Sequence, residues 1–305
     1  MDVINFRNKD MCNVFYLVKP IYSGSYSRTF LYKTTDLTGY PTLVILKFLY
    51  PFDKTPNFHF KNEKYILSNL IYKDISGKEY THPNLQYYYN DFIIEVNKQP
   101  LYDVIYQELL DGLSDKKKKK LKYGQPINGL ITGYVDGHNL DIISEKIHSN
   151  NIKPNTAFSY AYMNQMLSAV KYLHDRNIVH RDIKPANIIF NYRTNEYTLI
   201  DFGLSAHQTY QFHGGTDKYL YPKILKLRAE KKEVPFDLYK ATDIYAIGAT
   251  LFRYTHGYHC IKNGNIINPT YNDKNINIMI LKLMTEPEKG INYMINKWNR
   301  LIGES

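Results

Sequence analysis

Apolar and polar positions alternate along the first part of the chain and then change to a helical spacing. From Phe15 to Leu49, branched and aromatic residues alternate with turn residues, which predicts a meander of strands. From Phe60 to Ile71 the apolar residues recur three and four positions apart, which predicts a helix with one buried face. A further strand, rich in Tyr, Phe and Ile, is expected from Gln86 to Val96.

The second half of the chain is mainly helical by the same criterion. A long helix is predicted from Thr156 to Arg176, with Pro154 and Asn155 as its start signal. Helical apolar spacing returns at Ile276–Met284 and at Ile291–Leu301. The pattern therefore predicts a β-rich region followed by a helical one.

Composition supports a folded chain and locates much of its charge. The 305 residues are 44% hydrophobic, and aromatic residues alone make up 15%, which fits one large domain or two lobes and excludes a disordered chain. The formal net charge is +10. Lys116 to Lys120 together with Lys122 supply six positive charges within a predicted insert, Asn97 to Ile127. We interpret the run as a solvated loop and the whole insert as merely solvated, with docking of an acidic partner as the alternative.

The cysteines and the N-terminus bear on the compartment. Cys12 and Cys260 lie far apart and form no Cys-x-x-Cys pair, so free thiols in a reducing compartment are expected. Met1 to Cys12 lacks the apolar core of a signal peptide. No apolar run approaches the roughly eighteen residues that a membrane helix requires. We expect an intracellular, soluble, cytoplasmic protein, with the nucleus left open.

The candidate chemistry lies between His180 and Gly203. This stretch reads His-Arg-Asp-Ile-Lys-Pro-Ala-Asn, then a short apolar run, then Ile-Asp-Phe-Gly. Phosphoryl transfer requires an acceptor that orients the attacking hydroxyl and oxygen ligands that hold Mg²⁺ against the nucleotide phosphates. Asp182 is suited to the first task, and Asn187 and Asp201 are suited to the second.

These two motifs resemble the catalytic loop and the Asp-Phe-Gly motif of the eukaryotic-type protein kinase family. Lys184, followed by Pro-Ala-Asn, resembles the serine/threonine-specific branch. The resemblance covers residues 14–301 and implies an α+β, bilobal protein kinase fold. The small β-rich N-lobe with one key helix would span residues 14–132, and the larger, mainly helical C-lobe would span residues 136–301. Residues 1–13 would be an N-terminal extension and residues 302–305 a tail.

The resemblance also implies a role for residues in the N-lobe and the hinge. Lys47 would bind the α and β phosphates of ATP, and Glu63 would hold it in an ion pair. Thr132 would lie behind the adenine, whose edge would be bonded by the backbone. The other implied nucleotide contacts are Ile21, Gly24, Thr29, Ile45, Gly133 and Val135 near the base and phosphates, Asn139 near the ribose, and Ile189 beneath the adenine.

In the C-lobe the resemblance implies a catalytic pair and its supports. Asp182 would accept the proton of the substrate hydroxyl, and Lys184 would balance charge on the transferred group. Asn187 and Asp201 would bind Mg²⁺. Around them, the Thr216 hydroxyl of the Gly-Thr pair would bond Asp182 and Lys184, Asp243 would bond the backbone near His180 and Arg181, and His180 itself would be a packed structural residue, not a base.

The chain departs from the family pattern at Thr29, which replaces a valine, at Ile45, which replaces an alanine, and in two longer segments. In the glycine-rich loop Tyr22 and Ser27 replace two of the three glycines, which limits how closely the backbone approaches phosphates. Tyr221-Pro222-Lys223 replaces Ala-Pro-Glu, and residues 286–290, Glu-Pro-Glu-Lys-Gly, lack the arginine that pairs with that glutamate in relatives. Because both partners are absent, we expect no unpaired charge but softer support on the substrate side.

We therefore expect a monomeric serine/threonine protein kinase that transfers the γ-phosphoryl group of ATP, with Mg²⁺, to Ser/Thr hydroxyls of protein substrates. The alternative is a pseudokinase or scaffold that binds nucleotide or a partner without efficient turnover. A small-molecule kinase is a third reading. Neither a membrane nor a nucleic acid is expected as a partner. Thr209 and Tyr210 are candidate phosphorylation sites, although we favour a loop that is active without modification.

Overall fold

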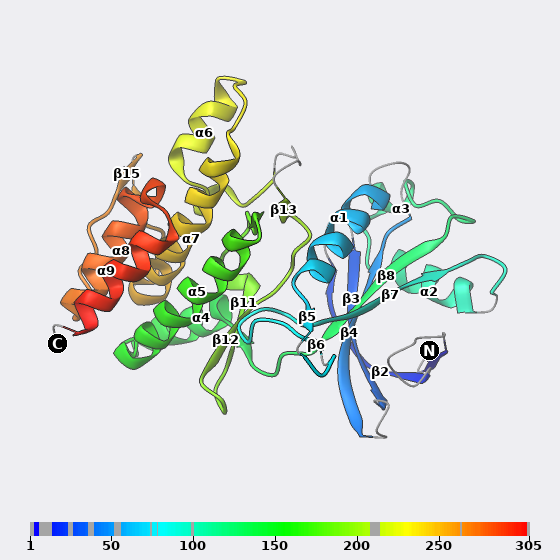
Figure 1. Cartoon of the computed structure of the whole chain (residues 1–305). Helices are drawn as coiled ribbons and strands as arrows, with labels where there is room; N and C mark the ends of the chain where they lie inside the picture. The colour runs from blue at the N-terminus through cyan, green and yellow to red at the C-terminus, as the bar shows by residue number, and fades with distance from the viewer. Residues whose placement is uncertain are drawn as a thin grey trace. The chain divides into compact units, whose positions relative to one another are not determined.

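The computed structural model describes residues 3–5, 14–23, 27–35, 40–51, 56–73, 75–77, 79–98, 101–207, 214–262 and 264–303. The chain divides into two units, and each is described by itself (Figure 1). Unit 1 contains the chain up to Tyr80 and Tyr87–Tyr134, whereas unit 2 contains Thr81–Gln86 and the chain from Val135 onward. The short segment Thr81–Gln86 therefore belongs to the second unit, although it lies between two parts of the first.

Unit 1 is built on an antiparallel sheet with the strand order β1-β2-β3-β4-β8-β7. Branched and aromatic residues dominate these strands, as expected for a pleated surface that is covered on both sides. A long helix and two short helices accompany the sheet. The elements are β1 (Val3–Asn5), β2 (Val14–Ser23), β3 (Ser27–Thr35), β4 (Pro41–Leu49), α1 (Pro56–Asn69), β5 (Tyr72–Lys73), β6 (Glu79–Tyr80), β7 (Tyr88–Ile94), α2 (Leu101–Asp111), α3 (Asp115–Lys118) and β8 (Ile127–Gly133).

The strand register assigns side chains to two faces of this sheet. Lys47 pairs with Leu130 on β8 and with Thr29 on β3, so these three side chains share one face, which we call the inner face. The outer face carries the alternate residues, and most of them are fully buried. One pair on that face, Phe92 and Gly129, fits only because glycine has no side chain: a Cβ at Gly129 would lie 2.0 Å from a ring atom of Phe92.

The insert was predicted to be merely solvated, and that prediction was wrong. Its helix α2 buries Tyr102, Ile105 and Leu109 in the apolar core of the outer face. These positions are three and four residues apart, the spacing that gives a helix one apolar face. In Figure 1, α2 and α1 lie on opposite sides of the sheet. The insert therefore forms a second layer over the outer face of the strands.

The lysine run forms the exposed end of this insert. Lys116 lies on the short helix α3 and is exposed, as are Lys119 and Lys120. This exposure confirms that the run is largely solvated. Part of it is helical, however, and not a loop. Leu113 and Leu121, which flank the run, are both buried in the core of unit 1. The lysines are therefore held on the surface by apolar anchors at either end.

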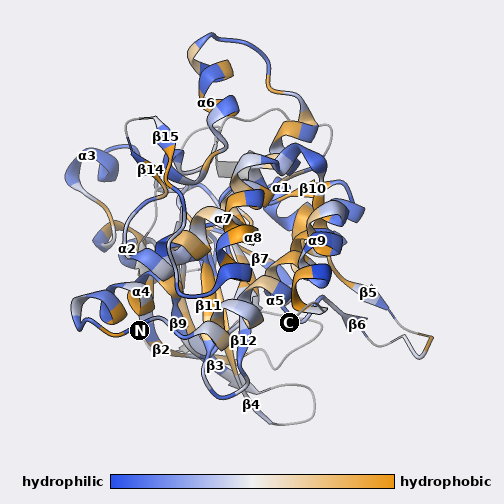
Figure 2. Cartoon of the chain, turned by 90° about the vertical axis from the view of Figure 1, so that its left-hand side faces the viewer, coloured by the Kyte–Doolittle hydropathy of each residue, from blue (hydrophilic) through white to orange (hydrophobic). Residues whose placement is uncertain are grey.

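Unit 2 is mainly helical around α7 (Phe236–His256), which is buried along most of its length. The remaining helices are α4 (Leu140–Ser149), α5 (Thr156–Asp175), α6 (Pro222–Ala229), α8 (Lys274–Thr285), α9 (Ile291–Gly303), η1 (Pro185–Asn187), η2 (Asp217–Tyr219) and η3 (Pro287–Lys289). The short strands are β9 (His138–Asn139), β10 (Ile178–Val179), β11 (Ile188–Asn191), β12 (Glu196–Leu199), β13 (Ala206–His207), β14 (Ile261–Lys262) and β15 (Asn265–Ile266). Figure 2 colours much of α7 and α8 as hydrophobic, in keeping with their central position in this unit.

Most predicted elements of both units are present, with small shifts at their ends. The helix expected from Thr156 ends one residue earlier than predicted, and Asn155 caps it by accepting a hydrogen bond from the Ala157 backbone N–H at 2.8 Å. The mixed α+β class, with a β-rich and a helical part, is confirmed. Among the residues that the structure covers, no helix is both long and apolar enough to span a membrane.

The burial of α2 generates a stability prediction. Leu109→Ala should lower the free energy of unfolding by roughly 2–5 kcal/mol, because it leaves a cavity between α2 and the sheet. The neighbouring Leu110 is only partly buried, so Leu110→Ala is a matched control with a smaller expected loss. Urea unfolding of the purified variants measures both changes. Equal, small losses for the two variants would mean that α2 does not belong to the core.

Candidate active site

In unit 1, an ion pair joins the sheet to helix α1. The Lys47 ammonium lies 2.8 Å from Oε1 and 3.0 Å from Oε2 of Glu63. Glu63 is buried and Lys47 is mostly buried. The predicted pair is therefore present, and it fixes a positive charge on the inner face of the sheet. Lys64, the next residue of α1, pairs with Asp91 on β7 and ties the helix to the sheet a second time.

Other residues predicted to contact nucleotide share this inner face. Thr29 lies directly opposite Lys47, and Ile45 lies opposite Thr132 in the strand register. Thr132 is buried, as expected for a residue behind a pocket. Ile21 is exposed on β2, where the register between β2 and β3 is irregular. Gly24 lies outside the described residues.

The predicted hinge and ribose positions have backbone and capping roles of their own. The Gly133 N–H donates to the Tyr87 carbonyl at 2.8 Å, so this N–H is already bonded within unit 1. Val135 begins the second part of unit 2. Asn139 caps α4 by accepting a hydrogen bond from Ile142 N–H at 2.9 Å, and it pairs with Ile189 between β9 and β11.

In unit 2, the carboxylate of Asp182 is held by three side chains. Lys184 Nζ donates to Oδ2 at 2.7 Å, and Asn187 Nδ2 donates to the same oxygen at 3.0 Å. The Thr216 hydroxyl donates to Oδ1 at 2.7 Å, and the Thr216 backbone N–H donates to it at 3.1 Å. Lys184 also contacts the Thr216 hydroxyl at 3.0 Å. The sequence motif and the Gly-Thr turn therefore meet at one carboxylate.

Gly215 explains how Thr216 reaches this carboxylate. Gly215 has φ +110°, a region that glycine adopts readily and other residues rarely adopt. A Cβ at this position would also lie 2.7 Å from the carbonyl oxygen of Arg181. Close packing of the turn against the catalytic loop therefore requires glycine directly before Thr216.

Asn187 and Asp201 supply oxygen atoms of the type that Mg²⁺ prefers. The Asn187 amide nitrogen donates to the Asp182 carbonyl at 2.9 Å and to its carboxylate, so the nitrogen side of the amide is committed and Oδ1 is directed elsewhere. Asp201 is exposed and has φ +64°, a strained value for a residue with a side chain. Its backbone N–H donates to Oε1 of the Gln86 side chain at 3.5 Å. The donor chemistry fits a magnesium site.

A fully buried carboxylate, Asp243 of α7, supports the catalytic loop from within unit 2. Its oxygens accept hydrogen bonds at 2.8 Å from the backbone N–H groups of His180 and Arg181, and at 3.1 Å from His174 Nε2. The contacts with the loop backbone were predicted. The contact with His174 was not, although its signal was in the sequence: a histidine at the end of a long predicted helix, six residues before His180.

His180 is fully buried and both ring nitrogens are used. Nδ1 accepts from the Asp182 backbone N–H at 3.3 Å, and Nε2 lies 3.2 Å from the Ile200 carbonyl, which it can bond as a donor. Burial lowers the pKa of His180, although nearby carboxylates oppose this effect. The ring also packs edge-on against Phe202 at 4.9 Å. His180 is therefore a neutral, packed residue that links the two motifs.

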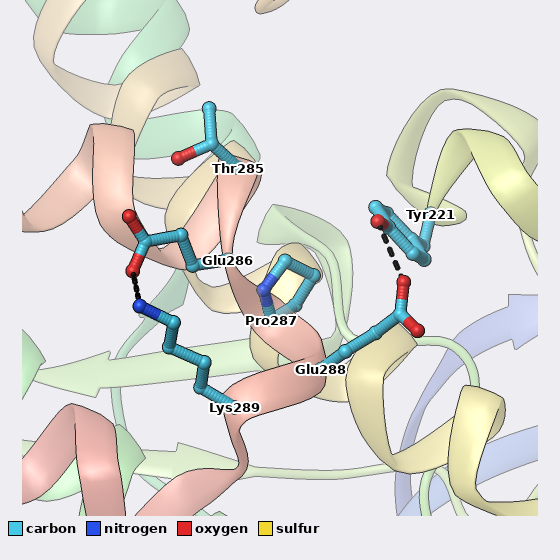
Figure 3. A pocket seen from close by; sticks show the side chains of 6 residues that line it. All are labelled: Tyr221, Thr285, Glu286, Pro287, Glu288 and Lys289. Carbon is cyan, nitrogen blue, oxygen red and sulfur yellow. Dashed lines mark hydrogen bonds and ion pairs between the residues drawn. The ribbon is translucent and has the colours of Figure 1, made fainter.

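The support expected to be absent behind the substrate turn is present with reversed charges, which corrects the prediction. Lys223 Nζ lies 2.8 Å from Oε2 of Glu288, and the Tyr221 hydroxyl donates to Oε1 at 3.1 Å. Figure 3 shows Tyr221 and Glu288 pointing toward one another beside a small pocket. The family pattern has a carboxylate at the position of Lys223 and an arginine near the C-terminus, at the position of Gly290. Here the cation is on α6, and its carboxylate partner is Glu288, two residues before Gly290.

Cys12, Thr209 and Tyr210, like Gly24, lie outside the described residues. Cys260 is a free, buried cysteine, as expected.

Comparisons with known proteins agree with the geometry of unit 2. The sequence profile of the protein kinase domain matches residues 122–301. The chain is 33% identical over 132 residues to serine/threonine-protein kinase Sgk2 of Rattus norvegicus, covering 42% of this chain and 32% of the relative. It is 37% identical over 105 residues to an Aurora kinase of Yarrowia lipolytica, covering 33% and 25%. It is 29% identical over 157 residues to a probable cAMP-dependent protein kinase catalytic subunit of Encephalitozoon cuniculi, covering 47% and 45%.

The chain thus spans less than half the length of each of these three relatives. The profile match nevertheless covers more than half of the chain and includes the loop of Asp182 and the Asp-Phe-Gly motif. By this match, and by its likeness to the kinases named above, the chain belongs to the eukaryotic-type protein kinase family.

Proposed function

We propose that this chain is a serine/threonine protein kinase that transfers the γ-phosphoryl group of ATP to hydroxyl groups of protein substrates. The observation that carries the proposal is the set of contacts around Asp182. A carboxylate held by a lysine, a threonine and an amide is oriented before any substrate arrives. Such preorganisation is what efficient phosphoryl transfer demands of a protein.

Each residue of this set has a distinct task in the proposed reaction. Asp182 accepts a hydrogen bond from the attacking Ser/Thr hydroxyl and orients it. It receives the hydroxyl proton as the new bond to the γ-phosphorus forms and the bond between that phosphorus and the β–γ bridging oxygen breaks, which releases ADP. Lys184 keeps a positive charge close to the carboxylate and balances the negative charge of the transferred group. Thr216 holds both side chains at one position, since its hydroxyl contacts each of them.

Lys47, which Glu63 holds on the inner face of the unit 1 sheet, would bind the α and β phosphates. Asn187 and Asp201 would hold Mg²⁺. When bound, that ion neutralises charge on the nucleotide phosphates. Ile45, Thr132 and the other base contacts implied by the resemblance would line the adenine site.

The proposed substrate class follows from the loop and from the relatives. Lys184 and the residues that follow it match the serine/threonine-specific pattern, and the similar proteins named above include a serine/threonine-protein kinase. The exposed lysines of the insert would favour a partner with acidic residues. The monomeric state and the cytoplasmic location expected from the sequence also remain proposals.

Replacing the proposed acceptor tests this function directly. Asp182→Asn should reduce phosphate transfer from Mg-ATP to a generic basic protein, or to the chain itself, by about 10²–10⁴-fold. Nucleotide binding, measured as the rise in melting temperature with Mg-ATP, should be retained. Acid hydrolysis of the product should release phosphoserine or phosphothreonine. Asp175→Asn, at an exposed ion pair with Lys171, is the control and should keep full activity.

The outcome separates the two readings of the site. If the unaltered chain transfers no phosphate although Mg-ATP raises its melting temperature, the pseudokinase alternative replaces this proposal. If nucleotide changes nothing, ATP is not a ligand of the chain.

We further infer that His180 has a structural role and not that of a base. A base must accept a proton near neutral pH, whereas burial lowers the pKa of His180. Both ring nitrogens are already committed to the Asp182 N–H and the Ile200 carbonyl. Protonation would place a second hydrogen where Nδ1 now accepts one.

This inference predicts how stability depends on pH. A histidine with a lowered pKa stabilises the fold while it is neutral, and that contribution is lost as the pH falls below 6.5, the ordinary pKa of histidine. Burial also lowers the pKa values of His82, His256 and His259, which adds to the effect. The free energy of unfolding, measured with urea, should therefore decrease from about pH 7.5 to about pH 5.5.

His180→Gln should show a smaller decrease over the same interval, because one titrating group is removed. Carboxylates with lowered pKa values do not affect this comparison, because their contribution to the stability of the fold is lost only at lower pH. Glu286 is an example: hydrogen bonding and ion pairing with Lys282 and Lys289 hold its pKa at about 2. Stability that is constant between the two pH values would contradict the inference.

A further inference from the structure

The insert helix α2 reaches the first residues of β3 through an ion pair. Oε2 of Glu108 on α2 lies 3.3 Å from Nη1 of Arg28. The side chains are 32% and 14% exposed, respectively. The Arg28 guanidinium also lies 5.0 Å from the centre of the Phe30 ring, so it is held between an aromatic face and a carboxylate.

The strand register places Arg28 directly behind the candidate nucleotide face. Arg28 pairs with Phe48 on the outer face, and the next pair, Thr29 with Lys47, faces the inner side. A shift of the β3 backbone at Arg28 therefore moves Thr29 with respect to Lys47. On its other edge, Arg28 pairs with Ser23 of β2, and the register between β2 and β3 shifts close to this point, between Pro20 and Tyr22.

The helix that carries Glu108 is firmly anchored. Its residues Tyr102, Ile105 and Leu109 are buried against the sheet. The Tyr102 hydroxyl donates to the Gln125 carbonyl at 2.8 Å and accepts from Gly124 N–H at 3.0 Å. Glu108 is therefore a charge on a rigid support, aimed at a strand that begins next to the candidate nucleotide face.

The charge of Glu108 also acts on Tyr32, a buried residue of β3. Burial, together with the negative charge of Glu108, raises the pKa of Tyr32, which lies two residues beyond Phe30 on the same face of β3. Tyr32 therefore carries no charge at neutral pH. Arg28 is the cation that faces Glu108 across the described contact between α2 and β3.

We propose that Glu108 is a positioning residue: through Arg28 it fixes the start of β3 so that Thr29 and Lys47 are held in place for nucleotide binding. The inference rests on the proposed use of ATP. The insert would then do more than cover the outer face: it would support the strand whose inner face carries the proposed phosphate contacts.

The test is the split between KM for ATP and kcat in the full-length chain. Glu108→Gln keeps the shape of the side chain but removes its charge, and it should raise KM for ATP by about threefold or more while kcat changes by less than about twofold. Asp111→Asn is the matched control. It removes one charge from the same helix at an exposed position, where its partner is Gln107, and should leave KM unchanged.

Charge exchange distinguishes positioning from general damage to the fold. Arg28→Glu should raise KM further than Glu108→Gln, because two carboxylates then face each other. Arg28→Glu combined with Glu108→Arg should return KM to within about twofold of the unaltered chain. Melting temperatures of all variants, measured without nucleotide, show whether a loss of stability accompanies the change in KM.

Direct titration with Mg-ADP keeps the inference separate from the proposed reaction. If the chain transfers phosphate and Glu108→Gln behaves like Asp111→Asn, the inference fails alone. If the chain transfers no phosphate but Glu108→Gln weakens Mg-ADP binding, the proposed reaction fails and the inference holds. If the unaltered chain binds no nucleotide, or if exchanging the charges restores nothing, the inference is overturned.

Discussion

The buried carboxylate of Asp243 is the constraint on which the candidate site in unit 2 depends. It has no exposed surface, so its charge is tolerable only because donors surround it. Two of its three donors are backbone N–H groups of the catalytic loop, at His180 and Arg181. Arg181 has φ +66°, a conformation that a side chain disfavours. The need to satisfy Asp243 therefore holds the loop in a strained shape, and that shape presents Asp182.

The same principle, a charge fixed by partners before the substrate arrives, is repeated in each unit. Asp182 is oriented by Lys184, Thr216 and Asn187, while Lys47 is oriented by Glu63. Charged groups that are already in place need little reorganisation when charge develops in a reaction. The supports differ in kind: in unit 2 they are short contacts within loops braced by α7, and in unit 1 they connect a helix to a sheet. The sheet itself is stiffened by the layer that α2 adds to its outer face.

The sequence predicted the fold class. Its motifs also identified the principal candidate residues, because the spacing within each motif is fixed. Asp182, Lys184 and Asn187 lie within six residues, and Thr216 is marked by a preceding glycine whose φ of +110° explains its presence. The insert was misjudged because its lysine run dominated the local pattern, although Tyr102, Ile105 and Leu109 have helical spacing. Arg28 and Glu108 could not be paired from sequence, since 80 positions separate them and only the packing of α2 on the sheet joins them.

The departures from the family pattern differ in their physical consequences. Reversing the charges of Lys223 and Glu288 preserves the attraction, because Coulomb energy depends on the product of the two charges. It does not preserve the geometry, since lysine is a point charge that lacks the planar fork of arginine. Tyr221 partly restores direction by donating to the same carboxylate, yet both charged side chains are about half exposed, so the pair contributes at most about 1 kcal/mol. The turn before α6 must therefore rely more on Gly215, Thr216 and the apolar packing of Leu220 than on this ion pair.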